Sequence, residues 1–227
     1  MILRNWEDLP KEMQNEQVRP YYDYLAKHKM SLAAKFLLDK VLAVVLLLIL
    51  SPIFLVIAIW IKCDSTGEVF FRQERVTRYG KKFRIYKFRT MVKNAEALGS
   101  QVTTNADMRV TKVGKKIRAC RLDEIPQLIN IIKGEMSFVG TRPEVPKYVK
   151  QYSAEMYATL LLPAGVTSEA SIEYKDEERL LSETNNVDDV YIKKVLPEKM
   201  RWNYIGINKQ GILADIKIMI RTVWAVS

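Results

Sequence analysis

One uninterrupted apolar stretch constrains this chain more than any other feature of its sequence. It runs from Val41 to Ile61, with Ser51 as its polar residue and no charged residue. About 20 such residues in a helix span the ~30 Å hydrocarbon core of a bilayer. A buried helix of a soluble domain rarely lacks a polar face over that length. The stretch therefore predicts a membrane helix.

A proline interrupts this stretch half-way. Pro52 removes a backbone N–H and sets its ring against the carbonyl one turn back, so we expect a kink, with the Ser51 hydroxyl available to bond a freed carbonyl. Lysines and arginines flank the stretch on both sides, and such cations mark the cytoplasmic side of membrane segments. Both ends then face the cytoplasm, which predicts a re-entrant helix-break-helix anchor. A spanning helix with a tolerated proline is the alternative.

This anchor divides the chain into three parts. Residues 1–40 combine tyrosines and lysines, which indicates an amphipathic N-terminal segment at headgroup level or, equally, a solvated helix. Residues 41–61 form the re-entrant membrane helix. Residues 62–227 suffice for one small cytoplasmic catalytic domain. We predict a mostly helical α+β fold for this monotopic membrane protein.

A β-hairpin is expected soon after the anchor. The runs Val69–Gln73 and Phe83–Met91 are rich in aromatic and β-branched residues, and a turn signal at residues 78–81 separates them. Basic and aromatic residues interleaved on strands can bind single-stranded nucleic acid. Beside a membrane anchor, phosphate or headgroup binding is the better interpretation, and we expect no nucleic-acid partner.

Composition limits the chemistry of the domain. The chain carries a net charge of +10, a lone histidine before the apolar stretch, and two cysteines, Cys63 and Cys120, in no metal or redox spacing. These counts exclude a histidine zinc cluster and a Ser-His-Asp triad after the stretch, and they favour a reducing compartment and an anionic partner. Nucleophilic, acid-base or metal chemistry must then rest on carboxylates, with lysines and arginines to hold phosphate.

Two adjacent carboxylates, Asp123 and Glu124, are the candidate catalytic residues. Pro126 suits the first turn of a helix and Gly134 its end, so we expect both carboxylates at a helix N-terminus. The dipole there would keep Asp123 ionised, as a carboxylate nucleophile requires. Glu124, with Asp123, offers hard oxygen ligands for Mg2+. The alternative is a helix cap with no chemical role.

Cations and polar residues around this pair are expected to bind a diphosphate. Arg118 and Arg121 precede it, and Arg142, fixed by Pro143 and close to Glu144, suits a diphosphate or nucleotide. Taken alone, the segment with Arg142, Pro143 and Glu144 is equally consistent with a surface turn. The predicted substrate-binding residues are Lys87, Arg89, Arg118, Arg121, Gln127, Arg142, Pro143 and Glu144.

Helical patterns occur in the last third of the chain. Residues 147–162 are expected to form one helix. Apolar residues from Ile212 to Trp224 recur at helical spacing, so a C-terminal helix either packs on the core or lies in the membrane interface; we favour the core.

These motifs, in this order and spacing, resemble the bacterial sugar transferases, the monotopic polyprenyl-phosphate phosphoglycosyl transferases. The resemblance covers the chain from Lys35 onward. It is carried by Asp39, Ser51-Pro52, VFFRQERV (69–76), GKKFRIYKFRTM (80–91), RLDEIPQLINIIKGEMSFVGTRPEVP (121–146) and PAGVTS (163–168).

The resemblance implies one reaction class. A UDP-sugar would give its sugar-1-phosphate to polyprenyl (undecaprenyl) phosphate, leaving UMP and initiating polysaccharide or glycoconjugate synthesis. It further implies that Asp123 forms an aspartyl phosphosugar, that Glu124 holds Mg2+, and that Arg118, Arg142 and Lys87 neutralise developing charge. The location would be the cytoplasmic face of the bacterial inner membrane. Homodimers, or contacts with later glycosyltransferases of the pathway, are possible partners.

Two alternatives keep the anchor without the reaction. One is a membrane-tethered basic protein that binds nucleic acid or anionic lipid, and the other is a scaffold for a polysaccharide machine. Both would be indifferent to replacement of Asp123. The sugar itself is not determined by these motifs, and we expect its contacts between Pro163 and Asn186.

Overall fold

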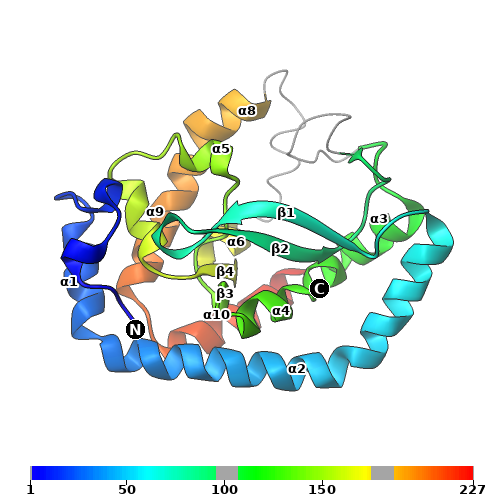
Figure 1. Cartoon of the computed structure of the whole chain (residues 1–227), viewed down its shortest axis with the longest axis horizontal. Helices are drawn as coiled ribbons and strands as arrows, with labels where there is room; N and C mark the ends of the chain where they lie inside the picture. Colours follow the sequence, from blue (N-terminus) through cyan, green and yellow to red (C-terminus); the bar gives the residue numbers. More distant parts are fainter. Residues whose placement is uncertain (1, 96–106, 175–186, 227) are drawn as a thin grey trace.

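The apolar stretch lies within one long helix that forms an edge of the molecule. Helix α2 (Lys29–Asp64) runs beneath the other elements in Figure 1, a view of the computed structural model, which describes residues 2–95, 107–174 and 187–226. Within those ranges it is the one helix long and apolar enough to cross a membrane. One of its faces leaves large apolar side chains exposed, among them Leu48, Ile49, Leu55, Val56 and Ile59.

Helix α2 bends and does not break. Its helical conformation continues through Pro52, and its second half turns away from the direction of the first in Figure 1. The Ser51 hydroxyl donates to the Leu48 carbonyl at 2.8 Å, and this is the carbonyl that loses its N–H partner to the proline. The expected role of Ser51 is confirmed, whereas the predicted helix-break-helix is a single bent helix. Serine supplies the missing hydrogen bond, so the backbone need not unwind.

The N-terminal segment folds onto the domain. Helix α1 (Arg19–Lys27) follows two 3-10 turns, η1 (Trp6–Asp8) and η2 (Lys11–Met13). Its Leu25 is fully buried in a cluster with Leu9 and Val18. The same cluster includes Leu161, which is more than a hundred residues away in sequence. Residues 29–40, expected to belong to this segment, are instead the first turns of α2.

The predicted hairpin is confirmed. Strands β1 (Phe70–Val76) and β2 (Lys82–Phe88) pair antiparallel, with Phe71 opposite Lys87, and the 3-10 turn η3 (Arg78–Gly80) joins them. Phe83 and Ile85 point into the core that faces α2, whereas Phe88 packs edge-on against Phe54 of α2 with ring centroids 5.1 Å apart. The hairpin therefore packs against both halves of α2.

A short central layer connects the hairpin to α2. It consists of α3 (Lys112–Ala119), the 3-10 turn η5 (Leu122–Glu124), α4 (Gln127–Ile132), and the parallel pair β3 (Met136–Val139) and β4 (Ala164–Thr167). The Gly114 backbone in α3 lies so close to Thr90 that a Cβ atom there would sit 2.0 Å from the Thr90 carbonyl oxygen. Gly134, at φ +76°, follows α4 and allows the chain to turn back, as predicted.

The single helix predicted over residues 147–162 is wrong. The structure has α5 (Pro146–Val149) and the 3-10 helix η6 (Glu155–Leu161), separated by an irregular stretch. Four consecutive residues, Ala158 to Leu161, are all buried. A segment without a solvent-facing side does not need the 3.6-residue period of a surface helix.

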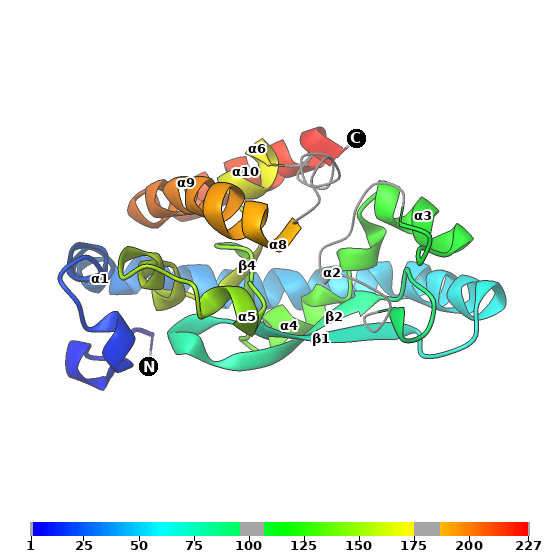
Figure 2. The same cartoon turned by 90° about the horizontal axis from the view of Figure 1, so that it is seen from above.

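Helices from the C-terminal part form the layer opposite the hairpin. They are α6 (Glu169–Glu173), α8 (Val187–Val190), a π-helical turn, η7 (Tyr191–Val195), α9 (Leu196–Asn208) and α10 (Ile212–Val226). Figure 2 shows the hairpin on one side of α2, and α9 and α10 on the other. Residues 175–186 of the expected sugar-contact segment lie outside the described residues.

Helix α10 packs on one face and exposes the other. Its Asp215 is buried against Lys35 of α2, with the ammonium and a carboxylate oxygen 2.5 Å apart, and the same ammonium lies 3.6 Å from Asp39. The opposite face exposes Leu213, Ile216, Ile220, Val223 and Trp224. The helix thus packs on the core, as favoured, and retains an apolar face directed away from it.

Candidate active site

Glu124 is the centre of a charge cluster between the hairpin and the loop that follows β3. Its Oε1 accepts from Lys87 Nζ at 2.8 Å and from Arg142 Nη2 at 2.5 Å, and Arg142 Nη1 lies 3.3 Å from Oε2. Burial would raise the pKa of Glu124, but Arg142 and Lys87 outweigh it and hold this pKa well below its ordinary value. Glu124 is therefore ionised at neutral pH.

Asp123 has the opposite electrostatic balance. Its side chain is 7% exposed, and burial raises its pKa, an effect that Lys87, Arg118 and Arg142 only partly offset. The expectation that a helix dipole keeps Asp123 ionised is wrong in its geometry, because both carboxylates occupy the separate turn η5 before α4. Arg121, just before this turn, has a left-handed backbone at φ +53°, a conformation that costs energy for a residue other than glycine.

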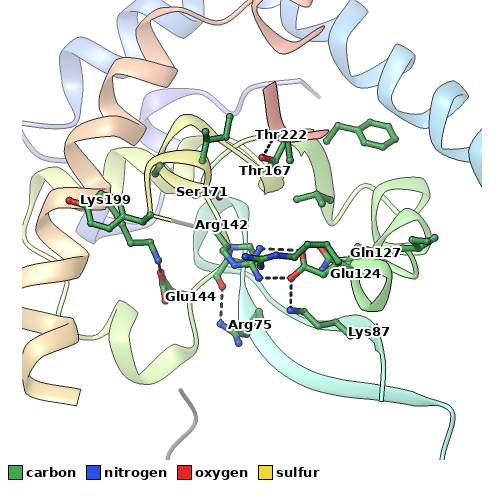
Figure 3. Close-up of a pocket in the computed structure, with 18 of the residues that line it drawn as sticks. Arg75, Lys87, Glu124, Gln127, Arg142, Glu144, Thr167, Ser171, Lys199 and Thr222 are labelled. Atoms are coloured by element: carbon green, nitrogen blue, oxygen red, sulfur yellow. Dashed lines mark hydrogen bonds and ion pairs between the residues drawn. The ribbon is translucent and has the colours of Figure 1, made fainter. Parts of the chain in front are cut away.

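A cavity of about 470 Å³ opens beside Glu124 and is lined by six cations. They come from the hairpin, α3, the loops beside η5 and β3, and α9: Arg75, Lys87, Arg118, Arg121, Arg142 and Lys199. Leu46 and Leu50 of α2 line the same cavity. Figure 3 shows Arg142 between Glu124 and Lys87 on one side and Glu144 and Lys199 on the other. The cavity thus joins a cationic site to the apolar helix.

Asp123 lines an adjoining cavity of about 540 Å³, whose wall consists largely of residues of the hairpin and of the segment that follows it. Arg75, Lys87 and Arg118 line both cavities. These three cations therefore connect the cavity of Glu124 with that of Asp123.

Two buried N–H donors in the wall of the Glu124 cavity have no hydrogen-bond partner among the described residues. They are Nε2 of Gln127, a residue 1% exposed, and Nε of Arg75. Buried N–H groups are nearly always paired in native proteins. Unpaired donors in the wall of a cationic cavity are what a site for an acceptor-rich, phosphate-containing ligand requires.

Most predicted binding residues converge on this cavity. Its lining includes Lys87, Arg118, Arg121, Gln127, Arg142, Pro143 and Glu144. Arg89 lies elsewhere: its guanidinium donates to the carbonyls of Ser65 and Thr66 at 2.8 and 2.6 Å, and so holds the loop that follows α2. Arg89 lines the cavity of Asp123 and not that of Glu124.

Among the cavity residues that the predicted binding set did not include are Arg75, Tyr191 and Lys199. Alternation along β1 could have identified Arg75, because it shares a face with Gln73 while Arg72 and Glu74 are exposed. Tyr191 and Lys199 belong to a helical segment without a recognisable motif. Only the fold brings them to the cavity.

The turn η5, which holds Asp123 and Glu124 and is called the carboxylate turn below, offers oxygen ligands that fit a magnesium ion. Mg2+ in phosphate chemistry is held by one or two carboxylates, substrate phosphates and water, and does not need a cage of protein ligands. Asp123 and Glu124 provide two such carboxylates, each of which lines one of the two adjoining cavities. The described residues contain no group of three or more His, Cys, Asp or Glu that could hold a metal by themselves.

Comparison with known proteins agrees with this geometry. The model of the bacterial sugar transferase family matches residues 30–227. The chain belongs to the bacterial sugar transferases. That match includes α2, the hairpin and the carboxylate turn, so the predicted family is confirmed.

Named relatives of this bacterial sugar transferase come from several bacteria. A "UDP-N-acetylgalactosamine-undecaprenyl-phosphate N-acetylgalactosaminephosphotransferase" of Aeromonas hydrophila is 36% identical over 190 residues, 82% of this chain and 42% of the relative. A "UDP-glucose:undecaprenyl-phosphate glucose-1-phosphate transferase" of Klebsiella pneumoniae is 33% identical over 218 residues, 94% of this chain and 44% of the relative. A protein of the same name from Caulobacter vibrioides is 33% identical over 192 residues, which are 83% of this chain and 68% of the relative. The chain thus spans less than half the length of the first two.

Proposed function

We propose that this protein transfers a sugar-1-phosphate from a UDP-sugar to polyprenyl phosphate, giving UMP and a polyprenyl-diphosphate sugar. The observation that carries the proposal is the cavity at Glu124, which six cations and the apolar residues Leu46 and Leu50 of α2 line together. A diphosphate suits the cations, and a lipid phosphate suits a site against a membrane helix. The names of the relatives, which are UDP-sugar and undecaprenyl-phosphate transferases, support the same reaction.

The chemistry follows from the two carboxylates. An oxygen of ionised Asp123 would attack the β-phosphorus of the donor, and the bond from that phosphorus to the bridging oxygen would break, releasing UMP. An oxygen of polyprenyl phosphate would then attack the same phosphorus and release Asp123. Lys87, Arg118 and Arg142 would hold the phosphate oxygens as charge develops. Mg2+, held by Glu124 and Asp123, would supply further charge neutralisation.

Burial of Asp123 suits its proposed role. A carboxylate that is removed from water and has a raised pKa is a stronger nucleophile than a solvated one, provided that it is ionised. The surrounding cations favour the ionised form.

We further propose that α2 is a re-entrant anchor on the cytoplasmic face of the inner membrane. Both halves of the helix pack on the domain: Ala43 contacts the cluster with Leu128, and Ile57 and Ile61 contact the cluster with Phe88. A helix held to the domain along its length cannot place one end across the bilayer while the domain stays on the other side. The exposed apolar faces of α2 and α10 would together contact the acyl chains and headgroups.

The direct test is UMP release by detergent-purified protein with polyprenyl phosphate, Mg2+ and a panel of UDP-sugars, beside Asp123→Asn. We expect release with a preferred donor and its loss in the variant and after chelation of Mg2+. Release that survives loss of Asp123 would refute the covalent mechanism. No release with any donor would favour the binding or scaffold alternatives.

A further inference from the structure

A second polar cluster lines the Glu124 cavity on the far side of Arg142. Glu144, Tyr191 and Lys199 are each at most 6% exposed. The Tyr191 hydroxyl donates to Glu144 Oε1 at 2.6 Å, and Lys199 Nζ donates to the Tyr191 oxygen at 3.1 Å and lies 3.7 Å from Glu144 Oε1. We call these three residues the far wall.

The far wall is ill suited to a phosphate. Its carboxylate would repel phosphate oxygens, and the nearby cation Lys199 is already paired with that carboxylate. A carboxylate, a phenol and an ammonium side by side offer both acceptors and donors, the set that hydroxyl groups need. The far wall therefore suits an uncharged, hydroxyl-rich part of a ligand.

Keeping these groups buried costs stability, which points to a role beyond packing. A buried ion pair generally gains less from its own attraction than it loses in hydration, so an apolar replacement would be as stable or more stable. Tyr191 also opens the π-helical turn η7, a backbone form that is uncommon and frequent at functional sites. Tyr148 packs against its ring with centroids 4.6 Å apart and fixes its orientation.

The position of the far wall identifies the part of the donor that it meets. Glu144 is two residues from Arg142, whose guanidinium binds Glu124 beside the reacting phosphate site. In a UDP-sugar the transferred sugar is bonded to that reacting β-phosphate, whereas the nucleoside is one phosphate further away. Both the sugar and the α-phosphate are joined to the β-phosphate through one oxygen, and the far wall suits the sugar because its carboxylate would repel the α-phosphate.

We propose that Glu144, Tyr191 and Lys199 form the subsite that recognises the hydroxyl groups of the transferred sugar. This inference rests on the proposed function and names the residues that would discriminate between donors. It adds Tyr191 and Lys199 to Glu144, and it extends the expected sugar contacts beyond the Pro163–Asn186 segment, of which Thr167, Ser171 and Tyr174 line the same cavity.

Equilibrium binding tests the subsite without requiring turnover. Affinities of UDP, UDP-glucose, UDP-galactose, their N-acetylamino counterparts and ADP-glucose would be measured for the wild type, Tyr191→Phe and Lys199→Met. Lys194→Met, at an exposed position of the same turn, is the matched control. Loss of one hydrogen bond should weaken the preferred UDP-sugar about tenfold in Tyr191→Phe. Affinity for UDP should stay unchanged, and the preference between donors that differ at one hydroxyl should shrink.

Three outcomes would overturn the subsite. Equal weakening of UDP and UDP-sugars would mean that the far wall only supports the fold. Loss of the preference for UDP-glucose over ADP-glucose would mean that the far wall contacts the nucleotide base and not the sugar. Unchanged affinities in both variants would mean that it does not contact the donor. Wild-type protein that binds UDP-sugars without transfer would refute the proposed function alone, whereas protein that binds none would refute both.

Discussion

The two adjacent carboxylates are predicted to affect stability in opposite directions. Ionised Asp123 is buried at a net electrostatic cost, since its pKa is raised, so Asp123→Asn should stabilise the protein at neutral pH. Glu124 is held ionised by two cations, and its loss leaves them without their counter-charge. Glu124→Gln should therefore destabilise the protein.

The magnitudes follow from burial. Lys87 and Arg142 have side chains 20% and 32% exposed, so leaving both unpaired should cost about 2–4 kcal/mol. At about 2–4 °C per kcal/mol for a chain of this size, Tm should fall by about 4–16 °C. Removing an unfavourable buried group commonly adds about 0.5–2 kcal/mol to the free energy of unfolding. For Asp123→Asn this corresponds to a rise in Tm of about 1–8 °C.

The pH dependence separates the two effects further. The pKa of Glu124 is lowered, so its contribution is present above the ordinary carboxylate range and is lost as pH falls through the folded-state pKa. The pKa of Asp123 is raised, so its cost appears as pH rises above the unfolded value and is complete above the folded-state pKa. Both differences from the wild type should shrink in acid.

Thermal unfolding in detergent between pH 4 and 8 measures this contrast. Glu74→Gln is the control, because Glu74 pairs with Lys82 at the exposed end of the hairpin and should change Tm little. A shift in the same direction for Asp123→Asn and Glu124→Gln would refute the reasoning.

Three further predictions concern the framework of the site. Lys35→Met should cost about 3–5 kcal/mol because it leaves buried carboxylates unpaired, and adding Asp215→Asn should restore part of the lost Tm; no restoration would refute the pairing of α2 with α10. Gly114→Ala should displace α3 and reduce transferase activity, because the new Cβ atom would collide with the Thr90 backbone. Gly206→Ala, where the new Cβ atom meets open space within a helix, should stabilise the protein by about 0.5–1 kcal/mol. Equal unfolding temperatures for the two variants would contradict this reasoning. Cys63, exposed just after the apolar stretch, should be protected in intact cells from an impermeant thiol reagent and become reactive after lysis; labelling from outside would refute the re-entrant anchor.

The sequence by itself determined the features that depend on local spacing. The apolar stretch predicted a membrane helix, and Ser51-Pro52 predicted the hydrogen bond at its centre, because a proline removes one particular donor and the preceding serine can replace it. Two runs rich in aromatic and β-branched residues, separated by a turn signal, predicted the hairpin, and Gly134 predicted the end of α4. Each of these is set by residues within a few turns of one another.

Tertiary structure decided what depends on burial and on distant partners. Neighbours in sequence, Asp123 and Glu124 have opposite pKa shifts, because one is mainly desolvated and the other is bonded to Lys87 and Arg142 from two other elements. Tyr191 and Lys199 line the cavity only because η7 and α9 pack against residues from distant parts of the chain. Periodicity describes one element at a time, whereas a site depends on how several elements pack.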